Sequence, residues 1–197
     1  MADARADTVT DPALARLSEA LGALPKRGLP PVEQWHPAHC GRIDIRIAGD
    51  GTWFHDGSPI RRPRLVKLFS TILRKEPDGS TVLVTPAERM TIQVDDAPFV
   101  AVEMAVEGEG AQKRIAFRTN VDDLVPLDAE HPMRFEQDGA GGLRPYILVR
   151  ADLWALLTRA LTYDLVAMAE EREIDGTAWI GLAAGGGFHR IAPTESL

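Results

Sequence analysis

Residues 41–73 read GRIDIRIAGDGTWFHDGSPIRRPRLVKLFSTIL, and this stretch decides the fold. Ile43, Ile45 and Ile47 alternate with polar residues, which is typical of a half-buried strand. Asp-Gly turns flank the short segment TWFH, so we expect it to return as the partner strand of a β-hairpin. From Pro63 onward, apolar residues recur at helical spacing, and proline is favoured at the first position of a helix. The stretch therefore predicts a hairpin followed by a helix.

Segments typical of strands alternate with turns through most of the remaining chain. They are TVLVTP, RMTIQV, FVAVEMAV, RIAFR, MRFE and LRPYILVR, and they are rich in β-branched and aromatic residues. Two further helices are expected. One begins near Asp11 in DPALARLSEALGAL, and a long one covers about 151–172, with Leu153, Leu157 and Leu161 on its buried face. The C-terminal segment TAWIGLAAGGGFHRI predicts two short strands around a loop, or a loose tail.

An internal similarity suggests that the chain contains two related modules. When residues 45–73 are placed on residues 133–161 without a gap, seven of the 29 pairs are identical, where composition alone gives about two. Both segments share an Asp-Gly turn and the spacing of their leucines. Convergence is the alternative, because turn chemistry and amphipathic helices produce part of such a match.

The predicted fold class is α+β, with two related modules. Each module would be an antiparallel sheet with one helix packed across it. The first module, residues 11–97, includes the N-terminal helix, and the second module covers residues 98–197.

Charge and cysteine content exclude some classes of function. The formal net charge is −7, which disfavours long polyanions such as DNA. Cys40 is the only cysteine, so no disulfide forms within the chain, and a reducing compartment is favoured. The sequence shows no signal peptide and no apolar run of about 20 residues. We therefore expect a soluble cytoplasmic protein that binds neither DNA nor membranes, and we expect no cofactor.

Several motifs resemble those of the bacterial family of domain of unknown function 1285 (DUF1285). They are CGRIDIRIAGDGTWFHDGSPIRRPRLVKLFSTILRKEPDG, LVTPAERMTIQVDDAPF and a closing Gly-Gly-x-Phe, and the similarity covers about residues 30–190. The resemblance implies a duplicated fold whose second half is like pleckstrin-homology domains. It also implies a nucleotide-type ligand between the halves and a role in signalling, and it supplies no catalytic residues.

Six residues are candidates for a ligand-binding site: Asp44, Arg46, Trp53, Arg62, Arg134 and Arg150. Arg62 and Arg150 occupy matching positions of the repeat, and each precedes an expected helix, where backbone N–H groups favour an anion. Two guanidinium groups related in this way would hold one phosphorylated ligand between the modules. The alternative for the polar strand residues is an exposed ion pair, and the alternative for Trp53 is ordinary packing.

Other motifs favour structural interpretations. Lys67, Arg74 and Lys75 are expected on a solvated helix face. The segment around His36, His39 and Cys40 combines metal-ligand residue types but lacks a second paired motif, so no metal site is predicted. AAGGGFHR lacks the Gly-Lys-Ser/Thr ending of a phosphate-binding loop and is interpreted as a turn.

These observations favour a non-enzymatic regulatory protein that binds a small anionic, nucleotide-type ligand between its modules. A protein- or peptide-binding adaptor is the alternative, with Trp154 as an exposed anchor. An enzyme that uses His55 or the Cys40 loop is the third hypothesis. The sequence does not decide the oligomeric state.

Overall fold

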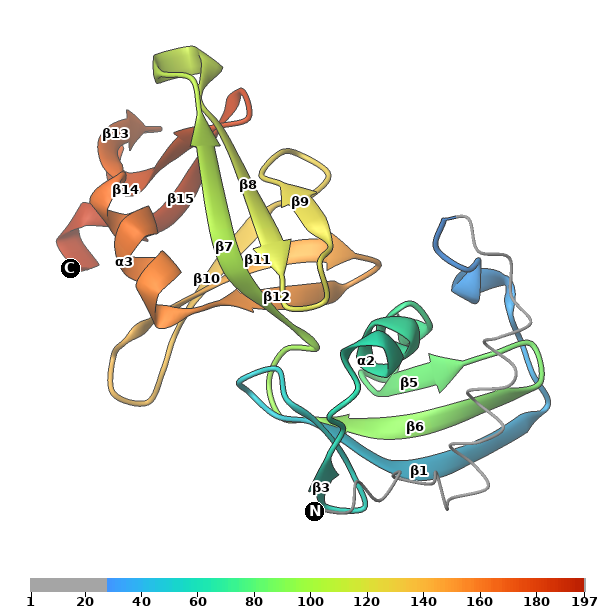
Figure 1. The fold of residues 1–197 in the computed structure, drawn as a ribbon. Helices are drawn as coiled ribbons and strands as arrows, with labels where there is room; N and C mark the ends of the chain where they lie inside the picture. Colours follow the sequence, from blue (N-terminus) through green and yellow to red (C-terminus); the bar gives the residue numbers. More distant parts are fainter. Residues whose placement is uncertain (1–27, 197) are drawn as a thin grey trace, which may run out of the picture. The chain divides into compact units, whose positions relative to one another are not determined.

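A computed structural model describes residues 28–196 (Figure 1). The chain divides into two compact units. Among the described residues, the first comprises 28–46 together with Thr52–Val94, and the second comprises Ile47–Gly51 together with 95–196. The helix expected near Asp11 lies outside the described residues. No helix in the described part of the chain is long and apolar enough to cross a membrane.

The first unit is built on a six-stranded sheet with the order β3-β2-β1-β6-β5-β4. Its strands are β1 (His39–Ile47), β2 (Trp53–His55), β3 (Ser58–Pro59), β4 (Leu73–Lys75), β5 (Thr81–Val84) and β6 (Glu88–Val94), and a 3-10 turn, η1 (Val32–Gln34), precedes them. The three isoleucines of β1 are buried and their neighbours are exposed, as the alternation predicted. Asp95 donates its N–H to the carbonyl of Ile47 (3.0 Å) and Gly41 lies against Met90, so β1 and β6 run in the same direction.

Helix α2 (Pro63–Ser70) lies over this sheet (Figure 1). It begins with proline, as the sequence predicted. Phe69 is fully buried and its ring lies 6.4 Å from that of Trp53. The helix is shorter than the apolar pattern, because Leu73 already belongs to β4.

The second unit contains a sheet with the order β10-β11-β12-β7-β8-β9. Its strands are β7 (Phe99–Glu107), β8 (Arg114–Thr119), β9 (Leu124–Pro126), β10 (Met133–Gln137), β11 (Leu143–Arg150) and β12 (Leu153–Leu157). A short 3-10 turn, η2 (Gly110–Gln112), connects β7 to β8. The central pair, β7 and β12, is parallel. Both large sheets therefore join two runs of three consecutive strands through the first and last strand of the module.

This shared strand order corrects the repeat that the sequence suggested. In the sheets, β1 corresponds to β7, whereas the alignment had placed the end of β1 on β10. It had also placed residues 62–73, which contain α2, on residues 150–161, which are not helical at their start. Ala151 and Asp152 form a turn with positive φ (40° and 59°) before β12.

The prediction of one long helix over 151–172 is wrong, because residues 153–157 form strand β12. Leu153, Ala155 and Leu157 are buried and the residues between them are half-buried, which is the period of a strand. The helix of this unit, α3 (Arg159–Ala167), starts only after Thr158. The fold is consequently a two-module, sheet-rich one with few helices, and α3 follows its sheet whereas α2 lies within the strand sequence of the first sheet.

The C-terminal segment forms a third, antiparallel sheet of β13 (Glu170–Ile174), β14 (Thr177–Ala184) and β15 (Gly187–Pro193), followed by a 3-10 turn, η3 (Thr194–Ser196). The two strands predicted around the glycine-rich loop are confirmed as β14 and β15. Gly185, in the turn between them, donates its N–H to the carbonyl of Lys113 (3.0 Å). This turn therefore attaches the small sheet to the rest of the second unit.

Replacing Gly185 by alanine is expected to destabilise the protein more than replacing Gly186. Both glycines have positive φ (61° and 76°), and alanine there costs about 1–2 kcal/mol. A Cβ at Gly185 would also lie 2.2 Å from the carbonyl oxygen of Leu127, whereas the space around Gly186 is open. Urea unfolding of the two variants measures the difference, and equal midpoints would contradict the close approach.

Candidate functional site

The predicted site residues of the first unit differ in their exposure. Asp44 and Arg46 are exposed on β1, and the guanidinium of Arg46 lies 5.5 Å from the ring of Phe54. Trp53 is only 2% exposed and packs on Phe69. Its proposed role in stacking on a ligand is therefore wrong, because its ring belongs to the core. Arg62 is exposed at the N-cap of α2 and its side chain does not cap the helix.

The predicted residues of the second unit are engaged with neighbouring side chains. Arg134 lies between the rings of Tyr146 and Trp154, at 4.7 and 4.6 Å. Arg150 donates to Asp123 (2.9 Å), and its guanidinium lies 5.0 Å from the ring of Phe99.

Two sequence interpretations change with these positions. Arg150 precedes a turn and a strand rather than a helix, so its equivalence with Arg62 is wrong. A ligand held by both residues stays a prediction, since they belong to different units. Trp154 is half-buried on β12 and not an exposed anchor on a helix.

Arg74, one of the basic residues predicted on a solvated helix face, also has a different environment. Arg74 is 7% exposed on β4 and is not part of a solvated helix face. It donates to the carbonyls of Val32 and Trp35 (2.7 and 2.8 Å) and to Glu76 (2.7 Å). Glu76 accepts a second charged hydrogen bond from Arg89 (3.0 Å). This network fastens the segment before β1 to the sheet.

The segment around Cys40 lies beside a groove of the first unit. His36 and Cys40 line a groove of about 430 Å³, and the thiol of Cys40 points to the carbonyl of Pro37 (3.8 Å). Within residues 28–196, Cys40 makes no hydrogen bond to a histidine. In the same part of the chain, no three His, Cys, Asp or Glu side chains gather as metal ligands.

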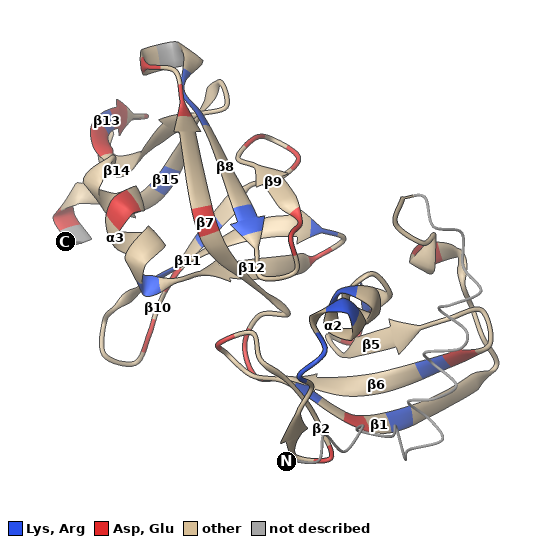
Figure 2. Cartoon of the chain, viewed as in Figure 1, with Lys and Arg blue, Asp and Glu red and all other residues tan. Residues whose placement is uncertain are grey.

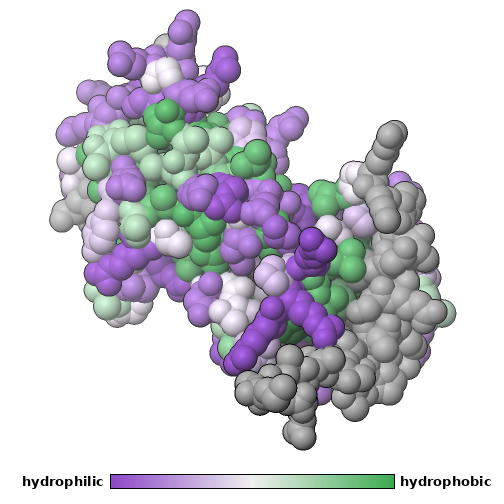
Figure 3. Space-filling view, in the orientation of Figure 1, coloured by the Kyte–Doolittle hydropathy of each residue, from purple (hydrophilic) through white to green (hydrophobic). Residues whose placement is uncertain are grey.

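A larger groove lies within the second unit and is called the α3 groove here. It has a volume of about 620 Å³ and is bounded by the β10–β11 loop, the start of β11, the end of β12 and one face of α3. Figure 3 shows hydrophobic and hydrophilic side chains next to one another on the surface around α3. This volume is in the range of small-molecule sites.

The orientation of α3 follows from its sequence. Thr158 is the N-cap, and its hydroxyl accepts the N–H of Leu161 (3.5 Å). Leu161 and Leu165 are buried. Arg159, Thr162, Tyr163 and Val166 follow the i, i+3, i+4, i+7 spacing of a single helix face, and all four line the groove.

The opposite wall is a loop held by its own carboxylate. Oδ1 of Asp138 accepts the N–H groups of Ala140 (2.9 Å) and Gly142 (2.7 Å). These hydrogen bonds lower the pKa of Asp138 below its usual range, so the group stays ionised. The main structural role of the Asp138 carboxylate is therefore to hold the β10–β11 loop in its turn.

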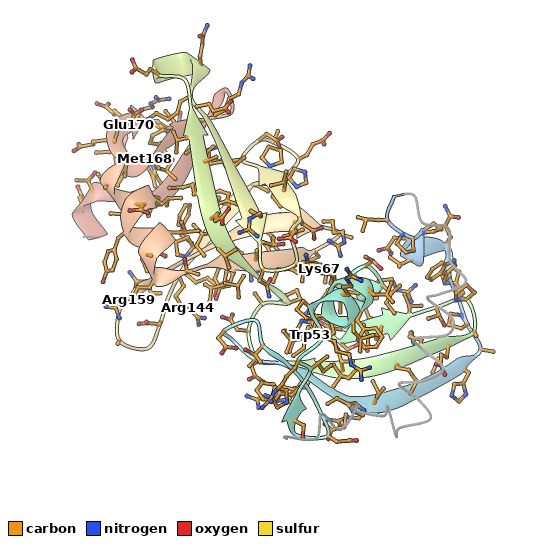
Figure 4. All side chains as sticks on the ribbon, viewed as in Figure 1. Trp53, Lys67, Arg144, Arg159, Met168 and Glu170 are labelled. Carbon is orange, nitrogen blue, oxygen red and sulfur yellow. The ribbon has the colours of Figure 1, made fainter. Side chains whose placement is uncertain are left out.

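Two arginines line the α3 groove, and each is held by a fixed partner. Arg159 donates from Nε and Nη2 to the phenol oxygen of Tyr163 (3.1 and 3.0 Å). Arg144 donates from Nη2 to Asp96. Figure 4 shows both arginines close together, and Figure 2 shows blue, the colour of Lys and Arg, at the beginning of α3. Within residues 28–196, no carboxylate lies within ion-pair distance of Arg159, although Asp138 interacts with it electrostatically.

The support for Arg144 is buried. Tyr146 is 1% exposed, and its hydroxyl donates to the second oxygen of Asp96 (2.9 Å). Burial raises the pKa of Tyr146 to about 12, and the hydrogen bond to the carboxylate of Asp96 acts in the same direction. The phenol therefore remains a hydrogen-bond donor at neutral pH and fixes Asp96, which in turn orients Arg144.

Sequence reasoning missed both arginines. The sequence did contain an indication for Arg159. Thr158, directly before it, is a preferred N-cap residue and marks the true start of the helix. Arg144 carries no comparable local signal, because only the pairing of β11 with β12 brings it to the groove.

The fold and the groove together define the class of this protein. It is a sheet-rich protein of two modules, and its second module carries a groove of a size that fits a small molecule. The chain belongs to the DUF1285 family. Residues 30–97 match the N-terminal domain of this family, whose function is unknown, and residues 98–191 match its C-terminal domain.

Two solved structures support this assignment. A DUF1285 family protein from Silicibacter pomeroyi DSS-3 is 42% identical, with a TM-score of 0.81 over 91% of this chain and 96% of that chain. A DUF1285 family protein from Shewanella baltica OS155 is 25% identical, with a TM-score of 0.50 over 62% of this chain and 90% of that chain. No curated protein matches the sequence.

The pKa of Tyr146 is expected to fall when Asp96 is replaced by asparagine. The substitution removes the negative acceptor that disfavours the phenolate, while the burial of the ring remains. Absorbance titration of the phenolate in a Tyr163→Phe background measures this, because Tyr146 is then the only tyrosine.

The raised pKa also sets the pH dependence of stability. The folded protein keeps the phenol protonated up to about pH 12, whereas the unfolded chain loses the proton near the ordinary tyrosine pKa of 10.0. The stabilisation from Tyr146 is therefore fully present below pH 10 and is lost towards pH 12. A pKa that is unchanged in Asp96→Asn would contradict the role given to Asp96.

Proposed function

We propose that the protein is a non-enzymatic binding protein for a small anionic ligand and that the α3 groove holds this ligand. The observation that carries the proposal is the pair of guanidinium groups, Arg144 and Arg159, on one groove of about 620 Å³. Each group is oriented by a neighbour and keeps further N–H donors. Guanidinium groups fixed in this way suit the two oxygens of a carboxylate or phosphate.

Charge balance supports a small anion rather than a large one. Asp96 neutralises much of the charge of Arg144, and Arg159 supplies a positive charge that has no ion pair among the described residues. The chain as a whole carries a net charge of −7, which repels extended polyanions. Attraction is thus local to the groove.

The finer features predicted from the sequence belong to the same proposal. A regulatory role in signalling and a pleckstrin-homology-like second module are compatible with a six-stranded sheet followed directly by α3. An exposed Cys40 favours a reducing compartment such as the cytoplasm.

A protein- or peptide-binding adaptor is the second candidate, and two exposed side chains on α3 favour it. Tyr163 is 61% exposed and Val166 is 44% exposed. Under this candidate, Tyr163→Ser would release a partner that co-purifies with the wild-type protein. Small anions would then leave the melting temperature unchanged.

Small anions are expected to stabilise the wild-type protein, and Arg144→Gln or Arg159→Gln is expected to reduce that effect. A ligand at a hundredfold excess over its Kd adds about 2.7 kcal/mol to the free energy of unfolding. Loss of one charged hydrogen bond costs about 1.5–3 kcal/mol, which weakens Kd about tenfold or more. Thermal unfolding with acetate, inorganic phosphate, octanoate and AMP measures the shift.

Arg172→Gln is the matched control. Arg172 lies on β13, pairs with Glu170 (2.7 Å) and does not line the groove, so the ligand-induced shift should survive its replacement. The proposal fails if no anion in the panel raises the melting temperature, or if the shift persists in the Arg144→Gln, Arg159→Gln double variant.

A further inference from the structure

We infer that the ligand of the α3 groove is an amphipathic monoanion, with a carboxylate-type head and an unbranched apolar tail. The inference rests on the proposed function and specifies its ligand class. The head would lie on Arg159 and Arg144, and the tail would follow α3 towards Val166.

The wall that α3 contributes to the groove is charged at Arg159 and apolar at Val166. Arg159 stands in the first turn of the helix and Val166 stands near its end. Their separation of seven positions corresponds to about 10 Å of helix axis. Leu143, Leu156 and Leu157 line the same groove and provide an apolar surface beside the helix. A ligand that matches this arrangement carries its charge at one end only.

The other polar side chains of the lining are already engaged. Thr162 donates its hydroxyl to the carbonyl of Thr158 (3.1 Å), and the hydroxyl of Tyr163 accepts both hydrogen bonds from Arg159. Oδ1 of Asp138 is bound by two N–H groups of its loop. Among the lining residues, only the guanidinium groups retain several donors, and no asparagine or glutamine is present to read a base or a sugar.

A second negative charge on the ligand would be unfavourable. Asp138 lines the groove and is ionised, and it interacts electrostatically with both Arg144 and Arg159. A di- or triphosphate would bring additional charge towards this carboxylate, and like charges repel. A monoanion places a single negative charge opposite Arg159 and brings less charge towards Asp138 than a di- or triphosphate does.

The test is a calorimetric titration of the full-length protein with hexanoate, octanoate and decanoate below their micelle concentrations. Each buried methylene strengthens binding about fourfold, so affinity should rise along the series. Acetate gives the affinity of the head alone. Decyltrimethylammonium has the tail of decanoate with the opposite charge, and AMP represents nucleotides.

Two variants separate the head from the tail. Arg159→Gln is expected to weaken decanoate binding about tenfold or more, by loss of a charged hydrogen bond. Val166→Glu, at an exposed position, is expected to weaken decanoate binding and to leave the response to acetate unchanged. Arg172→Gln is expected to bind decanoate as the wild type does.

The outcomes distinguish the inference from the proposed function. If AMP or acetate binds through Arg144 and Arg159 while affinity does not rise with chain length, the proposed function stands and the inference is wrong. If decyltrimethylammonium binds as well as decanoate, the groove recognises only the tail and the inference is also wrong. If none of the anions binds, both fail.

Discussion

The parallel pairing of β7 with β12 is the constraint on which the second module depends. It joins two runs of three strands into one sheet, and it fixes the point at which the chain leaves β12 and starts α3. Tyr146 pairs with Leu156 across β11 and β12, and the same antiparallel register continued by two residues places Arg144 opposite Thr158. Arg159 follows immediately. The backbone topology therefore brings the two arginines to one groove.

Asp96 connects this topology to the chemistry of the groove. It lies in the connection between β6 and β7, where it accepts hydrogen bonds from Arg144 and Tyr146. Because Tyr146 is buried and stays protonated, its hydroxyl continues to donate to this carboxylate and holds it in position. An oriented arginine loses less conformational freedom when it binds a ligand, so the support from Asp96 and Tyr146 favours affinity as well as geometry.

Much of the sheet structure could be predicted from the sequence, because alternation is unambiguous where polar and apolar residues strictly alternate, as in β1. The run LWALL in β12 is nearly all apolar, and such a run fits a helix and a strand equally well. Because this run was interpreted as part of a helix, the predicted start of the helix was too early. Thr158 was therefore not recognised as the N-cap of α3. The groove could not be predicted, since Arg144 and Arg159 come together only through the pairing of strands. Arg74 was misjudged because a charged residue that binds backbone carbonyls at a distance looks like a surface residue in the sequence.

The most direct measurement of the central claim is an NMR titration that follows the arginine Nε–H signals while decanoate is added. The account predicts that the signals of Arg144 and Arg159 shift together with one saturable dissociation constant, while the signal of Arg172 stays in place. The account would be contradicted if calorimetry shows that decanoate saturates the protein while the Nε–H signals of Arg144 and Arg159 stay unchanged.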